Sequence, residues 1–571
     1  MSKLDSTLVD LNDIQDYKVA ALPIIANFCQ ELGLTRQVDK QIDSPENISS
    51  GQVVVGMVMD TLSGRSPLYK LNEYFEGQDT ELIFGTKLKP SDFNDNNVGK
   101  VLDNIHAYGA SQLFSQITYG ACQKYDLNMK YMHYDTTSVS VHGDYDGYET
   151  ETDERIAITY GYNKDLRPDM KQFMMDALCV EGNIPLLGAA LSGNKADKKA
   201  NNTELTRVAS LMKKHKLDPM AYIYIADSAL VSPDNLQALE SQPFITRLPG
   251  NYSVEKQAID AAFKADNWTY VGALAEHIDP SNKRTSARYK LHETQVELYG
   301  RTYRAIVVHS TSHDKRRLKK TDKQIAADKE AFKKLSKELS KIYFNCKADA
   351  QRHADALLKQ TTLLFHELNF TIEENPIYQR GRPRQGQPRK IKQQRYQIST
   401  ELLTLQEKVD SVKERSGCFV LITNVPTEGD HAHDVTEILT AYKQQYGIEM
   451  NFRFLKDPII VNDTFLKKPE RIEALGFILL LSLMVWNLIQ HVIRKHIHQR
   501  DITLLGWDNK QTKKPTTMMV FFYFQHISIF IWNRGRHRKL SRTLKTHQKD
   551  YLSAMGLPES IFTTPVKTYR N

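Results

Sequence analysis

A block of short apolar segments begins near Met129 and constrains the fold more than any other feature of this sequence. KYMHYDTTSVSVHG is rich in aromatic and β-branched residues, which is typical of a strand. RIAITYGYNKD and QFMMDALCVEGNIPLLGAAL predict two further strands, the last a hairpin that turns at Glu181-Gly182-Asn183. NNTELTRVASLMKKH then predicts a helix opened by capping residues, and AYIYIAD predicts a strand inside a covered sheet. The predicted order is three strands, a helix and another strand.

The rest of the chain divides into regions of different character, as 571 residues are too many for one ordinary domain. Apolar residues at three- and four-residue spacing predict helices before the strand block. A small helical domain there is typical of a DNA reader, and a plain helical bundle is equally compatible with the pattern. We expect a helical domain at 1–125, an α/β domain in two parts at 126–246 and 416–500, an insertion at 247–415, and a helical, basic tail at 501–571.

The expected insertion combines three kinds of segment. RYKLHETQVELYGRTYRAIVVHS predicts a hairpin that turns at Gly300, and a highly charged helical stretch follows from about Lys315 to Leu368. A narrow apolar stripe on that stretch indicates a helical hairpin or a coiled-coil seam, and it consists of Phe332, Leu335, Leu339 and Ile342. QRGRPRQGQPRK then excludes regular structure, and CFVLITN resumes the buried-strand character.

Composition favours a protein that has no disulfides and that binds a polyanion. The five cysteines are far apart and form no CxxC pair, which fits a reducing cytoplasm. The net charge of +8 is modest, but two runs, 380–395 and 534–549, each hold seven Lys or Arg and no acid. Such runs are either solvated surfaces or contacts to a polyanion. The acidic N-terminus lacks the apolar core of a secretory signal, and we interpret the apolar stretch Ile472 to Ile493 as a core helix and not as a membrane span.

Three acidic residues stand out by their positions. Asp135 lies within the first predicted strand, Asp227 ends the strand AYIYIAD, and Glu449 follows CFVLITN on a predicted helix. Carboxylates at strand ends can project into a crevice and hold hard cations. Taken singly, an Asp after an apolar strand is more often a turn or cap residue.

The predicted helix around Glu449 carries more polar groups on the same side. Tyr442, Gln445, Glu449 and Lys456 are spaced by three, four and seven residues, which places them on one helical face beside an apolar stripe. An acid, a base, a phenol and an amide together suit a phosphate-contacting site. A solvated face with an accidental pattern is the alternative interpretation.

Six ordered blocks resemble one family of enzymes. HYDTTSVSVHG, GYNKDLRPDMKQ, LSGNKADK, YIADSALVSPDNL, YKQQYGIEMNFRFLK and FLKKPERIEALGFILLL are similar to the DDE-type insertion-sequence transposases of the IS-four superfamily. The resemblance spans roughly residues 20 to 500. It implies an RNase H-like catalytic core, a metal-binding catalytic triad of Asp135, Asp227 and Glu449, and two Mg²⁺ or Mn²⁺ ions. The long gap before Glu449 resembles the insertion that such transposases carry there.

The same resemblance identifies residues that would contact DNA. The family signature Y-x2-R-x3-E-x6-K is matched by Tyr442, Glu449 and Lys456, but Gln445 stands where the family has arginine. Glutamine offers only neutral hydrogen bonds to a phosphate, so we expect an altered grip on the DNA end and an intact reaction. Arg380 and Arg382 lie in Arg-Gly-Arg-Pro, which resembles the core of an AT-hook, although a flexible charged linker is the alternative.

The sequence therefore predicts an α/β multidomain transposase that cuts transposon ends and joins them to target DNA. The expected partners are double-stranded DNA, as terminal inverted repeats and target, and a second copy of the chain, with no membrane. The expected location is a prokaryotic cytoplasm. Two alternatives are an RNase H-like nuclease without strand transfer and a weakly active, transposase-derived DNA-binding protein. No P-loop indicates an ATP-driven motor, and His431 and His433 are interpreted as parts of a surface loop.

Overall fold

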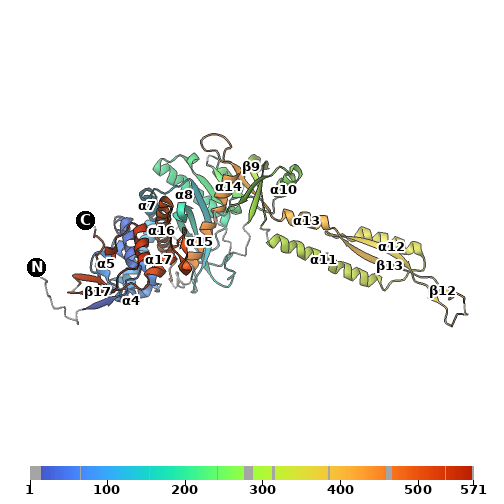
Figure 1. Ribbon diagram of the computed structural model, residues 1–571, viewed down its shortest axis with the longest axis horizontal. Helices are drawn as coiled ribbons and strands as arrows, with labels where there is room; N and C mark the ends of the chain where they lie inside the picture. The colour runs from blue at the N-terminus through green and yellow to red at the C-terminus, as the bar shows by residue number, and fades with distance from the viewer. Residues whose placement is uncertain are drawn as a thin grey trace. The chain divides into compact units, whose positions relative to one another are not determined.

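The computed structural model describes residues 14–64, 66–152, 155–240, 242–274, 287–311, 315–383, 386–457, 466–533 and 535–568 (Figure 1). It divides into two compact units, one made of Met1–Arg247 with Thr423–Asn571 and the other of Leu248–Ile422. Helices and sheets occur in both units. The expected mixed α/β, multidomain organisation is therefore confirmed.

Five neighbouring strands of a mixed sheet form the centre of the first unit. Their order is β4-β3-β2-β5-β6, where β2 is Tyr131–Ser140, β3 Gln172–Val180, β4 Ile184–Leu191, β5 Ile223–Ala226 and β6 Phe244–Arg247. The pairs β2–β3 and β3–β4 are antiparallel, whereas β2–β5 and β5–β6 are parallel. Nearly every residue of β3, β4 and β5 is buried, as expected for strands covered on both faces. The predicted hairpin turn at Glu181-Gly182-Asn183 is confirmed.

Two local predictions in this region are wrong. RIAITYGYNKD forms no strand, and isolated bridges join Arg155 to Thr152 and Thr159 to Gln172. The reason is that β2 pairs with one edge of β3 and β4 with the other from Met174 onward, so only the first residues of β3 are open to this segment. The helix α8 begins at Asp197 and ends at His215, so the residues predicted to cap it lie inside its first turns. Asn201, for example, donates its side-chain amide to the Asp197 carbonyl at 3.0 Å.

Helices surround this sheet. Those of the first unit before α8 are α1 Leu22–Glu31, α2 Leu34–Asp39, α3 Ser50–Met59, α4 Leu71–Glu76, α5 Thr80–Phe84, α6 Asp95–Tyr108 and α7 Ala110–Tyr125. Those after it are α9 Pro233–Ala238, α14 Val435–Lys443, α15 Tyr446–Lys456, α16 Pro469–Arg500, α17 Thr517–Phe524 and α18 Thr546–Ala554.

Helix α16 is the central helix of the first unit. By length and composition it could cross a membrane, and it is the single such helix within the described ranges, but 89% of its most apolar window is buried inside the protein. It packs against β4, α6 and α7. The interpretation of this apolar stretch as a core helix agrees with that burial.

The C-terminal region, which the sequence predicts as a helical and basic tail, has strands as well as helices. It contains the short strands β15 Leu504–Leu505, β16 Gln511–Thr512, β17 Ile529–Trp532 and β18 His537–Leu540. β17 pairs with β18 and with β1, Gln15–Tyr17, near the start of the chain. Arg538, within the second basic run, forms an ion pair with Asp79 at 2.6 Å, and its side chain is only 5% exposed. This arginine holds the region in the fold and is not a free phosphate contact.

The second unit contains two groups of strands. β7 Thr269–Ala273, β8 Arg288–Leu298 and β9 Arg301–Ser310 form an antiparallel sheet beside β14 Cys418–Thr423 and α10 Ser253–Ala265. β8 and β9 confirm the predicted hairpin at Gly300. The other group is a ribbon of β10 His366–Glu374 and β13 Tyr396–Thr404, with the short pair β11 Ile377–Tyr378 and β12 Ile391–Gln393 beyond it; α13 is Gln406–Arg415.

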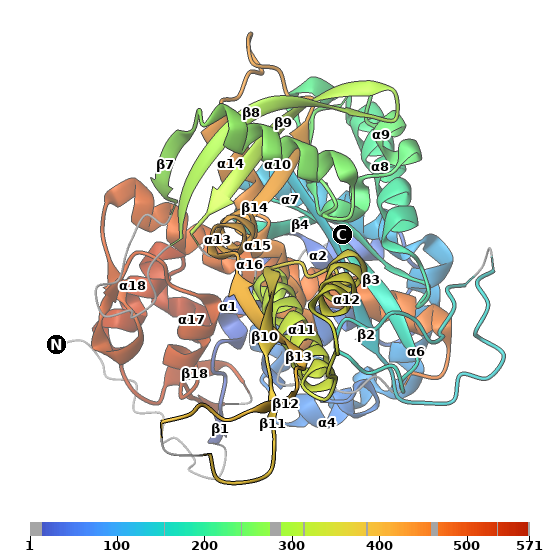
Figure 2. The same cartoon turned by 90° about the vertical axis from the view of Figure 1, so that its right-hand side faces the viewer.

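The long charged helix is shorter than predicted. α11 spans Lys315–Leu339 and α12 spans Lys347–Gln360, and both lie along the β10–β13 ribbon (Figures 1 and 2). Of the predicted apolar stripe, Leu335 and Leu339 pack with residues of α12 and of the ribbon, whereas Ile342 lies beyond α11 and is exposed. Leu339 shares a buried cluster with Ala350, Ala354 and Ile398. The ribbon completes a core that two narrow helical stripes could not close by themselves.

Candidate active site

Strand register brings the first two acids side by side. Tyr134 of β2 pairs in parallel with Ala226, the last residue of β5. Asp135 and Asp227 are the next residues on these two chains, so their Cα atoms are separated by about one interstrand spacing of 4.8 Å. Alternation along β2 then places Asp135 on the face that α15 covers, because Asn451 of α15 contacts Cys179, the residue paired with His133.

The environment of Asp135 opposes its negative charge. Its side chain is 22% exposed, and burial raises the pKa of this carboxyl to about 7. The nearby Lys164 ammonium, 3.8 Å from Asp135 Oδ1, acts against that increase, whereas Asp227 and Asp197 add to it. The backbone N–H of Thr136 donates to Asp135 Oδ1 at 2.7 Å. The Lys164 ammonium and the Thr136 N–H thus offset only part of the free-energy cost of burying the ionised Asp135 carboxylate.

Asp227 is fixed by the turn that follows β5. Its Oδ1 accepts from the Ala229 N–H at 2.9 Å and caps a 3-10 turn over Ser228–Leu230. Thr246 of β6 donates its hydroxyl to the Asp227 carbonyl at 2.7 Å. Burial raises the pKa of Asp227, Lys164 lowers it, and Asp197 raises it further. Asp227 is therefore a cap, as the alternative interpretation held, and it also shares its charged neighbours with Asp135.

Glu449 lies on α15, which packs on β2. The helix can lie this close because residue 447 is glycine: a Cβ there would be 1.9 Å from Asn183 Oδ1 in the β3–β4 turn. Ile448, Phe452 and Leu455 are buried and anchor the helix, as the predicted apolar stripe requires.

The single helix predicted from Tyr442 to Lys456 is wrong. α14 ends at Lys443 and α15 begins at Tyr446, with a turn between them that contains Gln445. The dihedral angles of Gln444 and Gln445 remain in the right-handed region, so the chain turns without reversing. Tyr442 consequently reaches the site from α14 and not from one straight face. Gln445 Nε2 donates weakly, at 3.5 Å, to the Tyr134 carbonyl of β2.

All three acids influence the pKa of Tyr442. Burial is the main reason that the pKa of its phenol rises to about 12. Asp227, Glu449 and Asp135 each raise it further, and Arg247 at the end of β6 lowers it. The three acids predicted from remote parts of the sequence therefore all act on the pKa of one phenol.

Three further residues at the site were missed by sequence reasoning. Lys164 lies in the loop that was predicted to be a strand, and Asp197 is the first residue of α8. Asp197 Oδ1 accepts from the Thr136 hydroxyl at 2.7 Å, and Arg247 is the cation next to Tyr442. Lys164 and Asp197 lie in the recognised blocks GYNKDLRPDMKQ and LSGNKADK, which is the only signal that could have indicated them.

The donor chemistry of this site suits a hard divalent cation, because the three acids offer only oxygen atoms. Within the described ranges, however, no three His, Cys, Asp or Glu side chains already stand together as a ligand set. Glu449 is exposed, while Asp135 and Asp227 are more enclosed. Their buried like charges are the electrostatic feature that a bound cation would relieve. The metal-binding role of the three acids stays a prediction.

A buried ionic cluster lies on the other face of β2. Tyr134 donates its hydroxyl to Asp176 Oδ2 at 3.2 Å, and Arg207 of α8 forms ion pairs with both Asp176 and Glu204. The Asp176 and Glu204 side chains are 0% exposed. No sequence pattern indicated this cluster. It links β2 and β3 to the body of α8, whose first residue, Asp197, reaches the site.

The other predicted DNA contacts occupy different surroundings. Lys456 is bound to Asp165, with Nζ 2.7 and 2.9 Å from the two carboxylate oxygens. Arg380 and Arg382 are exposed in the connection between β11 and β12 of the second unit. His433 is buried, and its Nε2 lies 3.1 Å from the Tyr131 hydroxyl, so the interpretation of this histidine as part of a surface loop is wrong.

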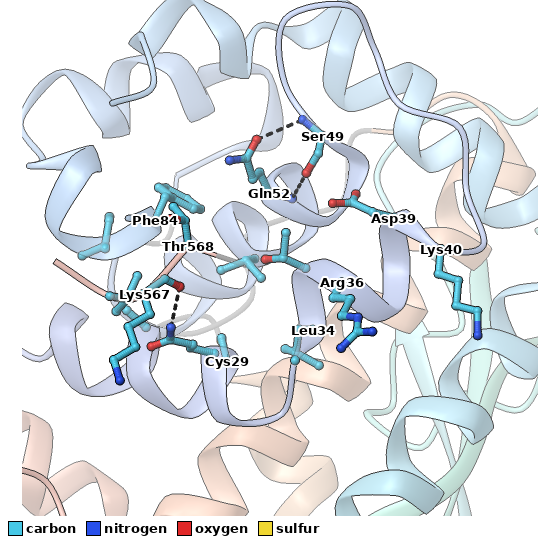
Figure 3. A pocket seen from close by; sticks show the side chains of 17 residues that line it. Cys29, Leu34, Arg36, Asp39, Lys40, Ser49, Gln52, Phe84, Lys567 and Thr568 are labelled. Carbon is cyan, nitrogen blue, oxygen red and sulfur yellow. Dashed lines mark hydrogen bonds between the residues drawn. The ribbon is translucent and has the colours of Figure 1, made fainter. Parts of the chain in front are cut away.

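The first unit also contains a cavity of about 530 Å³ among its N-terminal helices (Figure 3). Cys29, Arg36 and Asp39 line it, together with Val566, Lys567 and Thr568. Burial raises the pKa of the Cys29 thiol to about 12, so this thiol is protonated at neutral pH and unsuited to nucleophilic attack. The lining offers one acid, Asp39, which is occupied in accepting from the Gly51 N–H. The chemistry of the chain is better placed around Asp135.

Comparisons with known proteins add little to this site. A family model described as a domain of unknown function, DUF4277, matches residues 14–119 and stops before β2. No curated protein matches the chain. Two solved structures are similar, a Mos1 transposase paired-end complex with the left transposon end and a Mos1 mariner paired-end complex with Mn; their sequence identities are 10% and 11%. The matches cover 37% and 39% of this chain and 61% and 65% of theirs, so less than two thirds of each, and both TM-scores are 0.15. At these values the likeness carries no weight, and any assignment has to rest on the site.

Proposed function

We propose that this chain is a DDE-type transposase with an RNase H-like catalytic core, which cuts DNA at transposon ends and joins the ends to target DNA. The observation that carries the proposal is the adjacency of Asp135 and Asp227 after paired residues of β2 and β5, with α15, which carries Glu449, packed on β2. The sheet order β4-β3-β2-β5-β6, with an antiparallel meander followed by two parallel strands, supports the RNase H-like part.

Asp135 and Asp227 would hold divalent ions between them, and Glu449 would complete the ligand set. When bound, two such ions activate the attacking oxygen and stabilise the leaving oxygen of an in-line phosphoryl transfer. The attacking oxygen belongs to water in the cutting step and to a DNA 3′-hydroxyl in the joining step. No residue needs to form a covalent bond to DNA in either step.

The neighbouring side chains would position the DNA. The Tyr442 phenol stays protonated at neutral pH, because its pKa is about 12, and it can donate a hydrogen bond to a phosphate oxygen. Gln445 can donate only a neutral hydrogen bond, and Lys456 would exchange its ion pair with Asp165 for a phosphate. Arg380 and Arg382 would contact a minor groove away from the cut. Because two ends must be paired, a homodimer on DNA is the expected working form.

Substitution of the acids tests the proposal. Changing Asp135, Asp227 or Glu449 to Ala should abolish Mg²⁺-dependent cleavage of the DNA that flanks this reading frame, while binding of that DNA is retained. Asp234→Ala is a matched control, because this exposed acid lies on α9 shortly after Asp227 and caps nothing at the site. Near-normal cleavage by any of the three site variants would falsify the assignment.

The same reaction mixtures separate the two rival functions. A strand-transfer assay detects joined products, which an RNase H-like nuclease that only cuts does not form. A transposase-derived DNA-binding protein would bind the flanking DNA and neither cut nor join it. If the chain is a transposase, the wild-type protein binds the flanking DNA, cuts it and joins it to target DNA.

A further inference from the structure

Lys164 is placed at the acid pair by a loop that the rest of the fold holds firmly. The preceding Asn163 is buried, and its side-chain amide donates to Ser140 Oγ at 3.1 Å and to Gln172 Oε1 at 2.9 Å. The backbone N–H of Lys164 itself donates to Ser138 Oγ at 3.0 Å. The loop is thus attached to β2 at two successive residues, which fixes where the Lys164 side chain begins.

The ammonium group of Lys164 then lies against the part of β2 that carries the acid. Nζ donates to the Thr136 carbonyl at 2.5 Å and to Thr136 Oγ1 at 3.1 Å, and it is 3.8 Å from Asp135 Oδ1. Its positive charge acts on Asp227 as well as on Asp135, since it lowers the pKa of both carboxyls. Lys164 is therefore a cation shared by the two acids. Its side chain is 29% exposed, so it has room to move toward solvent.

We propose that Lys164 is an internal counter-cation, which neutralises the Asp135–Asp227 pair before divalent ions enter and leaves the pair when they bind. The inference rests on the proposed function, because it takes the acid pair to be the metal site. Two cations cannot share this position without strong repulsion, so the ammonium and the divalent ion compete for the same carboxylates.

The next residue connects this exchange to α15. Asp165 forms the ion pair with Lys456, so the loop that supplies Lys164 also holds the end of the helix that carries Glu449. If Lys164 moves away from the acid pair, it does so within a loop that the Asp165–Lys456 ion pair connects to α15. A positioning role of this kind is distinct from direct contact with the reacting phosphate.

Binding of Mn²⁺ alone, followed by electron paramagnetic resonance on the full chain at about pH 8, tests the inference. Lys164→Met keeps most of the side-chain volume and removes the charge, so it should bind Mn²⁺ about tenfold more tightly than wild type. Its metal-free form should unfold at a lower temperature than wild type, because the acid pair has lost its counter-charge. Lys164→Arg keeps the charge and should resemble wild type in both measurements.

Lys171→Met is the matched control. Lys171 is also a largely enclosed lysine, with an 11% exposed side chain, but it pairs with Glu149 and Asp146 and not with the acid pair. Its replacement should lower the unfolding temperature and leave the Mn²⁺ affinity unchanged. If Lys164→Met folds poorly, Lys164→Gln provides a second neutral variant for the same titration.

The outcomes separate the inference from the proposed function. Equal or weaker Mn²⁺ binding by both neutral Lys164 variants, with wild type binding normally, overturns the counter-cation role and leaves the metal site intact. Weakened DNA binding with unchanged Mn²⁺ affinity also overturns it and makes Lys164 a phosphate contact. Absence of Mn²⁺ binding in wild type, or Mn²⁺ binding that Asp135→Asn does not weaken, would instead remove the metal site itself.

Discussion

Replacement of Asp135 by Asn should stabilise the metal-free protein, although it removes an acid on which the proposed reaction depends. The folded-state pKa of Asp135 is about 7, compared with an ordinary value of 3.8. Between these two pH values the folded state binds a proton that the unfolded state has released, so the stability of the wild-type protein falls as pH rises from about 4 to about 7. Above about pH 7 the cost of the buried charge is complete.

The size of the effect follows from this shift. A difference of roughly three pH units corresponds to about 4 kcal/mol at pH 8 and to about 2 kcal/mol at pH 5. Asparagine has nearly the same shape and no charge, so Asp135→Asn should regain these amounts. For a cooperative unit of roughly 400 residues, about 4 kcal/mol corresponds to an increase in Tm of about 5 °C. Such a gain is expected where function requires a charge that folding disfavours.

Scanning calorimetry in EDTA at several pH values measures this difference. Asp165→Asn is the control, because it removes a more exposed carboxylate that also has a lysine partner, and it should not raise Tm. Added Mg²⁺ should raise the Tm of wild type more at pH 8 than at pH 5 and should not affect Asp135→Asn. An Asp135→Asn protein no more stable than wild type at pH 8 would refute the reasoning.

Three further changes test other parts of the structure. Arg207→Met leaves Asp176 and Glu204 buried without their cation, so urea unfolding should show a loss of about 3–5 kcal/mol; a loss below about 1 kcal/mol would contradict the ionic cluster. Arg538→Ala removes a buried ion pair that attaches the C-terminal region, and limited proteolysis should then cut that region faster than in wild type. Gln445→Arg should tighten binding of end DNA in a gel-shift titration and leave the metal dependence of cleavage unchanged; weaker binding would show that this position does not contact a phosphate.

The strands that carry the site could be predicted from the sequence because a strand buried on both faces has a continuous run of apolar residues. The apolar content of AYIYIAD and of the hairpin around Gly182 directly reflects coverage on both faces. The position of Asp227 at a strand end followed from the same pattern. Its neighbour Asp135 could be proposed, but the adjacency of the two depends on parallel register, which no local pattern contains.

The residues that sequence reasoning missed act through long-range contacts. Lys164 was assigned to a strand because RIAITYGYNKD has strand composition, yet β2 pairs with one edge of β3 and β4 with the other from Met174 onward. Asp176 lies within a buried strand, and its polar partner Arg207 is distant in sequence, so only the folded structure shows why a charge is tolerated there. The break before Tyr446 was missed for a related reason, because helical periodicity continues through residues whose dihedral angles stay helical.

The pairing of β1 with β17 has a consequence for synthesis on the ribosome. Tyr17 lies opposite Ile529, and the Val566 N–H donates to the Leu82 carbonyl, so segments far apart in the sequence are built into one structure. At about 5–20 residues per second, roughly 25–100 s pass between translation of the two partner strands. During that interval the nascent N-terminal helices lack the neighbours that complete their core. Chaperones that bind exposed apolar surface therefore have a long period in which to act on this chain.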